Sequence, residues 1–272
     1  MTGNRYLIEA TELNARLTAE PDLQLIDLGS PELYAQAHVP GAVSFPYAAL
    51  VSGAQPDAGT LPPLESIISA LEAAGISSDA PMVAYDGEGS GKAARFCWTM
   101  DVLGFGDWAL LNGGLQAWAA GSFAMENQPV TREAARFTAR DSTAQVLANA
   151  EYIVDRLGNA DFGLLDARTP GEYAGQDVRS ARGGRIPGAQ NLNWMDTMNP
   201  ADNGRLLEPD TLRGMLEERG LTPDREIVAY CQTHHRSAHS YVMLKSLGYE
   251  HIRGYDGSWS QWGNRTDLPI ES

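Results

Sequence analysis

The residues with the strongest chemical character stand in one short stretch, Cys231-Gln232-Thr233-His234-His235-Arg236. The stretch follows the apolar run Ile227–Tyr230 and precedes a run with helical spacing, so we expect Cys231 at the carboxyl end of a buried strand. A loop that enters a helix offers free N–H groups and a positive dipole to an anion. Together with Arg236 and two histidines, these features lower the pKa of a thiol and favour the nucleophilic thiolate. We therefore predict that Cys231 is a nucleophile and that the loop amides bind the anionic part of a substrate.

Other chemical interpretations of nearby residues are weaker. His235 and His239 have i,i+4 spacing, but no Glu follows the first His to complete a His-Glu-x-x-His motif, so no metal is expected at these histidines. The segment Gly87–Lys92 is one residue too short for a phosphate-binding Gly-x4-Gly-Lys-Ser/Thr loop, and alanine follows the lysine. We expect no cofactor. Cys97 lies inside a helical run and is predicted to pack in the core.

The elements that would position Cys231 occur twice in the chain. Five blocks recur in the same order, at offsets of about 139 to 147 residues. The pairs are Leu25–Leu28 with Leu164–Ala167, Pro31–Tyr34 with Pro170–Tyr173, His38–Ala42 with Arg185–Ala189, Met82–Asp86 with Ile227–Cys231, and Leu103–Phe105 with Leu247–Tyr249. We predict two tandem domains, residues 1–125 and 144–272, joined by a linker at 126–143. Asp86 stands at the cysteine position of the first copy, which is therefore predicted to be inactive.

Within each copy, short apolar runs alternate with helical runs. The predicted strands are Leu23–Leu28, Met82–Tyr85, Ala109–Leu111, Phe162–Asp166, Ile227–Tyr230 and His251–Arg253. The main predicted helices are Leu64–Ala74, Ala93–Leu103, Thr211–Arg219 and Ser237–Leu247. This alternation predicts an α/β fold in which a mostly parallel sheet carries helices on both faces. In such sheets, the ligand site lies at the carboxyl ends of the strands.

Composition narrows the function classes. The 272 residues are 43% hydrophobic and 20% charged, and the net charge of −15 disfavours nucleic acid and anionic membrane surfaces as partners. No apolar run is long enough to span a membrane, and Met1–Glu20 lacks the apolar stretch of a signal peptide. Two cysteines exclude a disulfide scaffold and a four-cysteine zinc site. We expect a cytoplasmic protein, and a monomer because the two copies already form a pseudo-dimer.

The motif set resembles that of the tandem rhodanese family, and the resemblance covers nearly the whole chain. It consists of an Asp before a Pro-Glu-Tyr segment, the Pro-Gly-Ala blocks, a loop that begins with Cys231, and a Gly-Ser-x-x-x-Trp ending. The resemblance implies a sulfurtransferase with a catalytic second copy and an inactive first copy. It also implies that Cys231 takes the outer sulfur of thiosulfate as a persulfide and passes it to cyanide or a thiol. The residues Gln232, Thr233, His234, His235 and Arg236 would then hold the persulfide without a metal.

Loop length and charge distinguish a thiosulfate sulfurtransferase from phosphatases and mercaptopyruvate sulfurtransferases. Cys231 and Arg236 have the spacing Cys-x4-Arg, one residue shorter than the Cys-x5-Arg loop of phosphatases. Mercaptopyruvate sulfurtransferases usually carry a small neutral loop, whereas this loop carries Arg236 and two histidines, and this difference favours the thiosulfate dianion as donor. Two alternatives stay open: a 3-mercaptopyruvate sulfurtransferase, and a persulfide carrier that serves a partner protein.

Three further residues are predicted to support the site. Arg185 closes an arginine-rich stretch that the first copy lacks, and it is a candidate for binding the anionic donor. Asp166 ends the neighbouring strand and is expected to orient Arg168 or polar groups under the loop. Trp194 is expected to cover the pocket.

Overall fold

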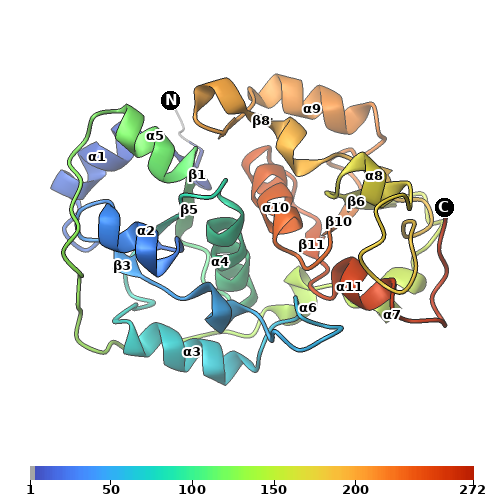
Figure 1. The fold of residues 1–272 in the computed structure, drawn as a ribbon, viewed down its shortest axis with the longest axis horizontal. Helices are drawn as coiled ribbons and strands as arrows, with labels where there is room; N and C mark the ends of the chain where they lie inside the picture. The colour runs from blue at the N-terminus through green and yellow to red at the C-terminus, as the bar shows by residue number, and fades with distance from the viewer. Residues whose placement is uncertain (1–3) are drawn as a thin grey trace. The chain divides into compact units, whose positions relative to one another are not determined.

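The computed structural model describes residues 4–272, which divide into two compact units (Figure 1). The first unit contains the residues up to Leu50 together with Pro62–Ser142 and Asn199–Leu206. The second unit contains Val51–Leu61, Thr143–Met198 and Leu207–Ser272. Both units are α/β with parallel sheets, which confirms the predicted fold class. Each unit is built from three separate stretches of chain.

The first unit is organised around a five-stranded parallel sheet with the strand order β1-β5-β4-β2-β3. Its strands are β1 (Leu7–Ile8), β2 (Gln24–Asp27), β3 (Val43–Ser44), β4 (Met82–Tyr85) and β5 (Trp108–Leu111). Its helices are α1 (Ala10–Ala19), α2 (Pro31–Gln36), the 3₁₀ helix η1 (Tyr47–Leu50), α3 (Leu64–Ala73), α4 (Gly91–Val102) and α5 (Gly114–Ala120).

The second unit has a four-stranded parallel sheet with the order β11-β10-β6-β7. Its strands are β6 (Phe162–Asp166), β7 (Gln190–Asn191), β10 (Glu226–Tyr230) and β11 (Ile252–Gly254). Its helices are α6 (Thr143–Val146), α7 (Ala150–Val154), α8 (Pro170–Tyr173), η2 (Trp194–Thr197), α9 (Pro209–Glu217), α10 (Arg236–Ser246) and α11 (Ser258–Trp262). In the chain, η3 (Pro200–Asp202) and a small two-stranded sheet of β8 (Met198–Asn199) and β9 (Arg205–Leu206) follow η2, and Asn199–Leu206 of this stretch belongs to the first unit.

Alternate residues of the central strands divide each core between two faces of the sheet. On β10, Val228 and Tyr230 pack in a cluster with Ile153 of α7 and Trp259 of α11. Helix α10 packs against β10 and β11 as well, and its buried residues lie outside this cluster. The strand that precedes the predicted nucleophile is therefore covered by helices on both sides, and its carboxyl end is held in a fixed position.

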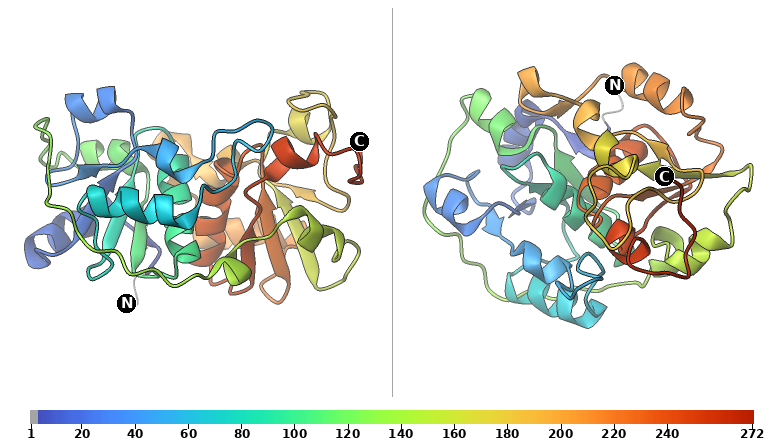
Figure 2. Two further views of the ribbon diagram at one scale, coloured as in Figure 1. Left: turned by 90° about the horizontal axis from the view of Figure 1, so that it is seen from below. Right: turned by 45° about the vertical axis from the view of Figure 1, so that its right-hand side comes forward.

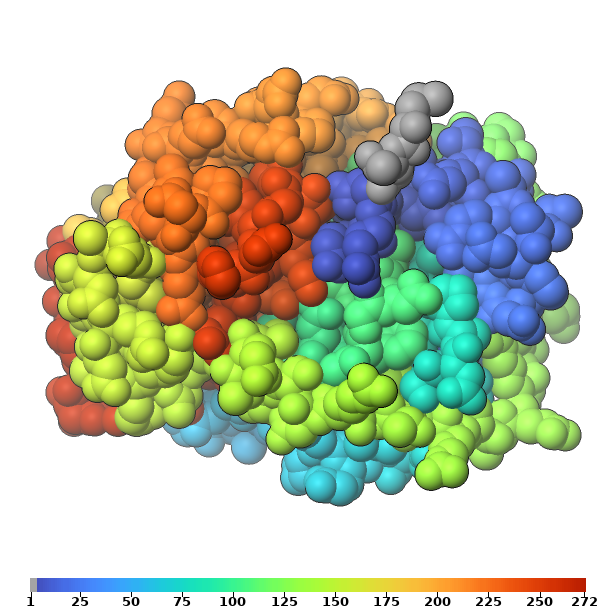
Figure 3. Space-filling view, turned by 180° about the vertical axis from the view of Figure 1, so that it is seen from behind, coloured from blue at the N-terminus to red at the C-terminus, as the bar shows by residue number. Residues whose placement is uncertain are grey.

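The segment between the two copies is extended. It follows the outside of the first unit before it reaches α6, as the views in Figures 2 and 3 show. The backbone N–H of Ala135 donates to the carbonyl of Glu72 on α3, and Phe137 is buried. The predicted linker at 126–143 therefore contributes core contacts to the first unit.

The main predicted elements agree with the structure to within about two residues at each end. The strands β1, β3 and β7 were not predicted, because two residues are too short to form a pattern. Among residues 4–272, no helix has both the length and the apolar character that a membrane crossing requires.

Candidate active site

Cys231 lies where the prediction placed it, directly after β10 and five residues before the first residue of α10. Its side chain is fully buried. Because β6 and β11 run parallel to β10, the loops that follow these strands meet at the same edge of the sheet. The loop that begins with Cys231 is therefore surrounded by residues from β6, from α8 and from the turn before α11.

The first residues of α11 hold the back of this loop. Ser258, with φ 50°, accepts hydrogen bonds on its Oγ from the N–H groups of Cys231 (3.2 Å) and His234 (3.1 Å). In return, the N–H groups of Trp259 and Ser260 donate to the carbonyls of Cys231 and Gln232, each at 2.9 Å. These bonds turn the first two loop carbonyls away from the sulfur. The amides of Thr233 and Ser237 are left as donors to it.

The electrostatic setting favours the thiolate. Burial by itself raises the pKa of the Cys231 thiol, but the positive charge of Arg236 and hydrogen bonds from Ser237 and Thr233 outweigh it, so the pKa lies below its usual value. Nδ1 of His234 lies 2.7 Å from Oγ of Ser237. When Nδ1–H of His234 donates to this hydroxyl, the hydroxyl proton is free to donate to the sulfur. In this tautomer, the imidazole acts on the thiolate through Ser237.

Arg236 is held by a carboxylate that the sequence interpretation did not identify. Its Nη1 and Nη2 donate to Oε2 and Oε1 of Glu172 at 2.6 and 2.9 Å. Burial raises the pKa of Glu172, but hydrogen bonds and charge from Arg236, with further bonds from Thr169, lower it to about 2. Nε of Arg179 lies 3.4 Å from Oε1 of the same carboxylate. In the sequence, Glu172 differs from the matching residue of the first copy, Leu33, and this difference is the signal that could have indicated a role for it.

Asp166 forms a buried ion pair with Arg168. The guanidinium donates to Asp166 from Nε at 3.0 Å and from Nη2 at 2.6 Å, and it lies 4.5 Å from the centre of the Trp259 ring. Arg168 also donates to the carbonyl of Gly184. The backbone N–H of Trp259 donates to the carbonyl of Cys231, so the ion pair supports the loop through Trp259.

The arginine-rich stretch is divided between two places. Arg185 pairs with Glu271 at 3.2 Å and lies over the ring of Tyr173. Arg182 donates to backbone carbonyls near the C-terminus. Arg179 has a side chain that is 61% exposed, and its carbonyl accepts a hydrogen bond from Gln232 of the loop. Of the three arginines, Arg179 is therefore the one that the described contacts join directly to the loop.

Trp194 packs against the start of α10. Its ring lies 5.9 Å from that of His235 and 5.6 Å from that of His239. Burial, and then the charge of His235, lower the pKa of His239 to about 4, so this imidazole is neutral at pH 7. Residues 4–272 contain no group of three His, Cys, Asp or Glu side chains placed to hold a metal ion. Trp194 thus covers the side of the loop that carries His235.

A second segment that the sequence interpretation missed comes from far away in the chain. Gly59, in the Val51–Leu61 stretch of the second unit, packs closely on the loop. A Cβ added at Gly59 would lie 2.5 Å from the carbonyl oxygen of Thr233 and 2.7 Å from that of Asp256. The N–H of Leu61 donates to the carboxylate of Asp256 at 2.8 Å. Only a residue without a side chain fits at this contact.

The first copy has a similar loop with a different occupant. Asp86 follows β4, and its fully buried carboxylate accepts hydrogen bonds from the N–H groups of Glu88, Ser90 and Ala93 at 2.8, 2.8 and 2.9 Å. In the second copy, the amides of Thr233 and Ser237 face the sulfur of Cys231, whereas the N–H of His234 donates to Ser258. Both loops therefore present amides to an anion, and the first loop supplies that anion itself.

The basic end of the first loop also differs. Lys92 is separated from Asp86 by five residues, against four between Cys231 and Arg236, and it forms an ion pair with Glu88.

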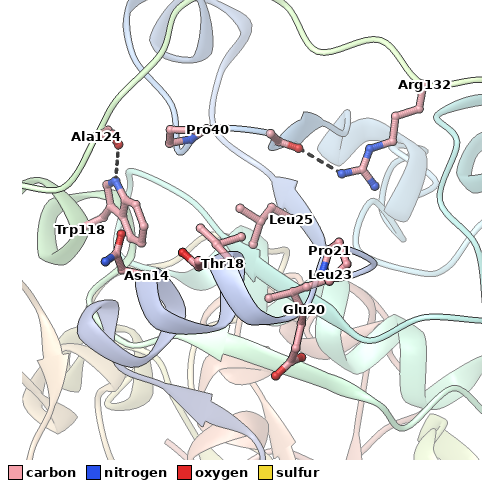
Figure 4. Close-up of a pocket in the computed structure, with 12 residues that line it drawn as sticks. Asn14, Thr18, Glu20, Pro21, Leu23, Leu25, Pro40, Trp118, Ala124 and Arg132 are labelled. Atoms are coloured by element: carbon pink, nitrogen blue, oxygen red, sulfur yellow. Dashed lines mark hydrogen bonds between the residues drawn. The ribbon is translucent and has the colours of Figure 1, made fainter.

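A groove of about 470 Å³ in the same unit lies away from this loop, between α1, Pro40 and the linker (Figure 4). Its Arg132 donates to the carbonyl of Gly41. The residues lining this groove include no cysteine, so it offers no sulfur nucleophile.

Comparison with known proteins agrees with the repeat. The family model described as a rhodanese-like domain matches residues 9–121 and again residues 149–265. A thiosulfate sulfurtransferase of Azotobacter vinelandii is 43% identical over 269 residues, which cover 97% of this chain and 96% of that protein. A thiosulfate sulfurtransferase of Pseudomonas aeruginosa is 41% identical, with the same coverage.

More distant proteins are similar over most of the chain as well. A 3-mercaptopyruvate sulfurtransferase of Escherichia coli is 28% identical over 93% of both chains. Among solved structures, the anaerobic ergothioneine biosynthesis enzyme of Chlorobium limicola superposes with a TM-score of 0.89, at 23% identity, over 99% of this chain and 70% of that one. At this identity the likeness concerns the fold alone.

Proposed function

We propose that this chain, which belongs to the rhodanese-like domain family, is a thiosulfate sulfurtransferase that moves sulfane sulfur through a persulfide on Cys231. The observation that carries the proposal is the buried loop in which Cys231 faces two backbone amides, the Ser237 hydroxyl and the charge of Arg236. This arrangement suits a sulfur atom that must be anionic both before and after it accepts a second sulfur.

In the first half-reaction, the Cys231 thiolate attacks the outer sulfur of thiosulfate. The new S–S bond forms on the cysteine, the S–S bond of thiosulfate breaks, and its electron pair leaves with sulfite. The reacting ions are all negative, so cationic and N–H groups are needed to bring them together. Arg236 and the amides of Thr233 and Ser237 supply them next to the sulfur.

In the second half-reaction, cyanide or a thiolate attacks the terminal sulfur of the persulfide. With cyanide, a C–S bond forms, the persulfide bond breaks, and the Cys231 thiolate is regenerated with thiocyanate as product. The amides of Gln232, Thr233, His235 and Arg236 hold the terminal anion between the two steps, because the N–H of His234 is taken by Ser258. The hydroxyl of Ser237, aligned by His234, donates to the cysteine sulfur.

The donor is attracted by the arginines of the second copy. Arg179 is exposed and joined to the loop through Gln232, so it is the cation that a sulfonate group meets near Cys231. Arg185 adds charge from a position farther along the same stretch, beside Glu271. Asp166 and Trp194 support the loop and bind no donor. A monomeric state and a cytoplasmic location stay predictions of the sequence.

The test is the intact mass of the purified protein after thiosulfate and then after cyanide, with peptide mapping of the modified cysteine. We expect one added sulfur atom on Cys231, and its loss to cyanide with formation of thiocyanate. Cys231→Ser is expected to take up no sulfur. A gain of sulfur on Cys97 instead of Cys231 would overturn the assignment.

The donor and the acceptor are distinguished in the same experiment. Sulfur uptake from mercaptopyruvate, with none from thiosulfate, would replace the proposal with a 3-mercaptopyruvate sulfurtransferase. Uptake from thiosulfate without release to cyanide or small thiols would indicate a persulfide carrier that needs a protein acceptor.

A further inference from the structure

The guanidinium of Arg236, which lies beside Cys231, is paired with a carboxylate. The side chain of Arg236 is only 15% exposed, and both of its terminal nitrogens are used by the carboxylate of Glu172, whose side chain is fully buried. A two-point contact between two planar groups fixes the orientation of a guanidinium as well as its distance. Where Arg236 points is therefore decided by Glu172, a residue 64 positions earlier in the chain.

Helix capping does not account for the carboxylate at position 172. Glu172 does complete a capping box with Thr169 at the start of α8. In the first copy, however, Ser30 caps α2 through the N–H of Leu33, so the residue at the position of Glu172 has no carboxylate. The capping therefore works without a glutamate at this position.

The two copies provide an internal comparison. Tyr34 and Tyr173, one residue after the position in question, each donate to the carbonyl of an alanine, so this part of the fold is the same in both. The difference is at Leu33 and Glu172. The carboxylate occurs in the copy that has the cysteine and the arginine.

We propose that Glu172 is a positioning residue of the sulfur site: its buried carboxylate fixes the guanidinium of Arg236 beside Cys231 and thereby keeps the thiolate formed. The biological meaning of this assignment rests on the proposed sulfur transfer. The contact itself is a property of the loop and can be tested without any turnover.

The direction of the effect separates positioning from plain charge. If Arg236 stayed in place, removal of the negative charge of Glu172 would leave more net positive charge near Cys231, and the thiolate would be favoured further. If Glu172 holds Arg236, its removal frees the guanidinium to turn toward solvent, and the thiolate is disfavoured. The two explanations predict opposite changes in the reactivity of Cys231.

The experiment is the pH dependence of the alkylation of Cys231 by iodoacetamide, followed by peptide mass so that Cys97 does not contribute. Glu172→Gln keeps the shape and the hydrogen bond to Thr169 and removes the charge. We expect its alkylation rate at pH 7 to fall by about tenfold or more, the smallest change expected when a neighbouring opposite charge is lost. Arg236→Ala should show a similar fall, and the double variant should show no further loss.

Two other variants complete the test. Glu172→Asp keeps the charge but is one methylene shorter, so positioning predicts a fall here too, whereas a charge effect predicts none. Glu226→Gln is the matched control, because Glu226 is a part-buried partner of Arg253 at the other end of β10 and should leave the profile unchanged. A faster alkylation in Glu172→Gln, or effects of Glu172→Gln and Arg236→Ala that simply add, would overturn the proposal. Sulfur uptake measured on the same variants reports separately on the proposed function.

Discussion

The carboxylate of Asp86 allows the binding of an anion by such a loop to be tested in the first copy, where Asp86 stands at the position of Cys231. It accepts three backbone N–H groups at 2.8, 2.8 and 2.9 Å, and no part of the residue is exposed. In Asp86→Asn, the amide oxygen can still accept the two bonds to Oδ1, but the NH₂ group then faces the N–H of Ala93. Two donors therefore meet in a buried place.

The magnitude follows from the bond that is lost. A hydrogen bond to a charged acceptor contributes about 1.5–3 kcal/mol, and a buried donor without a partner costs about 1–3 kcal/mol. We expect Asp86→Asn to lose about 3 kcal/mol in free energy of unfolding. The opposite orientation of the amide would break two bonds instead of one, so it would not reduce the loss of stability.

The assay is urea unfolding at pH 7, compared with Asp27→Asn. Asp27 is also buried, with 2% exposure, and it ends the neighbouring strand β2, but it accepts one backbone N–H, from Gly29, and one bond from the side chain of Tyr85. An asparagine can accept from Gly29 with its oxygen and donate to the Tyr85 hydroxyl with its NH₂ group, so a loss below about 1 kcal/mol is expected there. If Asp86→Asn is no less stable than Asp27→Asn, the amides of the loop do not need an anion, and the reasoning for the Cys231 loop fails with it.

Three other results are expected. Cys231→Ser should form no thiocyanate from thiosulfate and cyanide, whereas Cys97→Ser, at a fully buried position of α4, should keep most of the activity. Gly59→Ala should slow alkylation of Cys231 because its Cβ would lie 2.5 Å from a loop carbonyl, and Gly214→Ala, with open space around it, should not; equal rates would exclude a positioning role for that contact. Burial lowers the pKa of His239 to about 4, so the unfolded chain binds a proton that the folded one does not, and stability should fall by about 3 kcal/mol from pH 7 to pH 4 in urea unfolding. His239→Gln should flatten this dependence, and an unchanged slope would assign it to other groups.

The fold could be predicted because its signals are local. Strands such as Met82–Tyr85 and Phe162–Asp166 are continuous apolar runs, and the repetition of ordered blocks shows that the same units occur twice. The position of Cys231 in the fold could be predicted for the same reason, since a strand, a cysteine, a basic loop and a helix follow one another directly in the chain.

The remaining parts of the site depend on contacts between distant residues. Glu172 reaches Arg236 across 64 positions, and Gly59 meets Thr233 from another stretch of the chain. Neither residue type is unusual at its place in the sequence. The orientation of the Arg185 side chain likewise depends on its ion pair with Glu271, near the C-terminus. A sequence pattern cannot show which partner an arginine takes.

The way in which the chain is shared between the two units bears on how such a duplicated protein evolves. Val51–Leu61 is encoded with the first copy but belongs to the unit that carries Cys231, and Asn199–Leu206 is encoded with the second copy but belongs to the other unit. Deleting the half of the gene that encodes Asp86 at the cysteine position would therefore remove Gly59 and Leu61 from beside the Cys231 loop. Selection on the chemistry of the Cys231 loop would then act on the coding sequence of both copies.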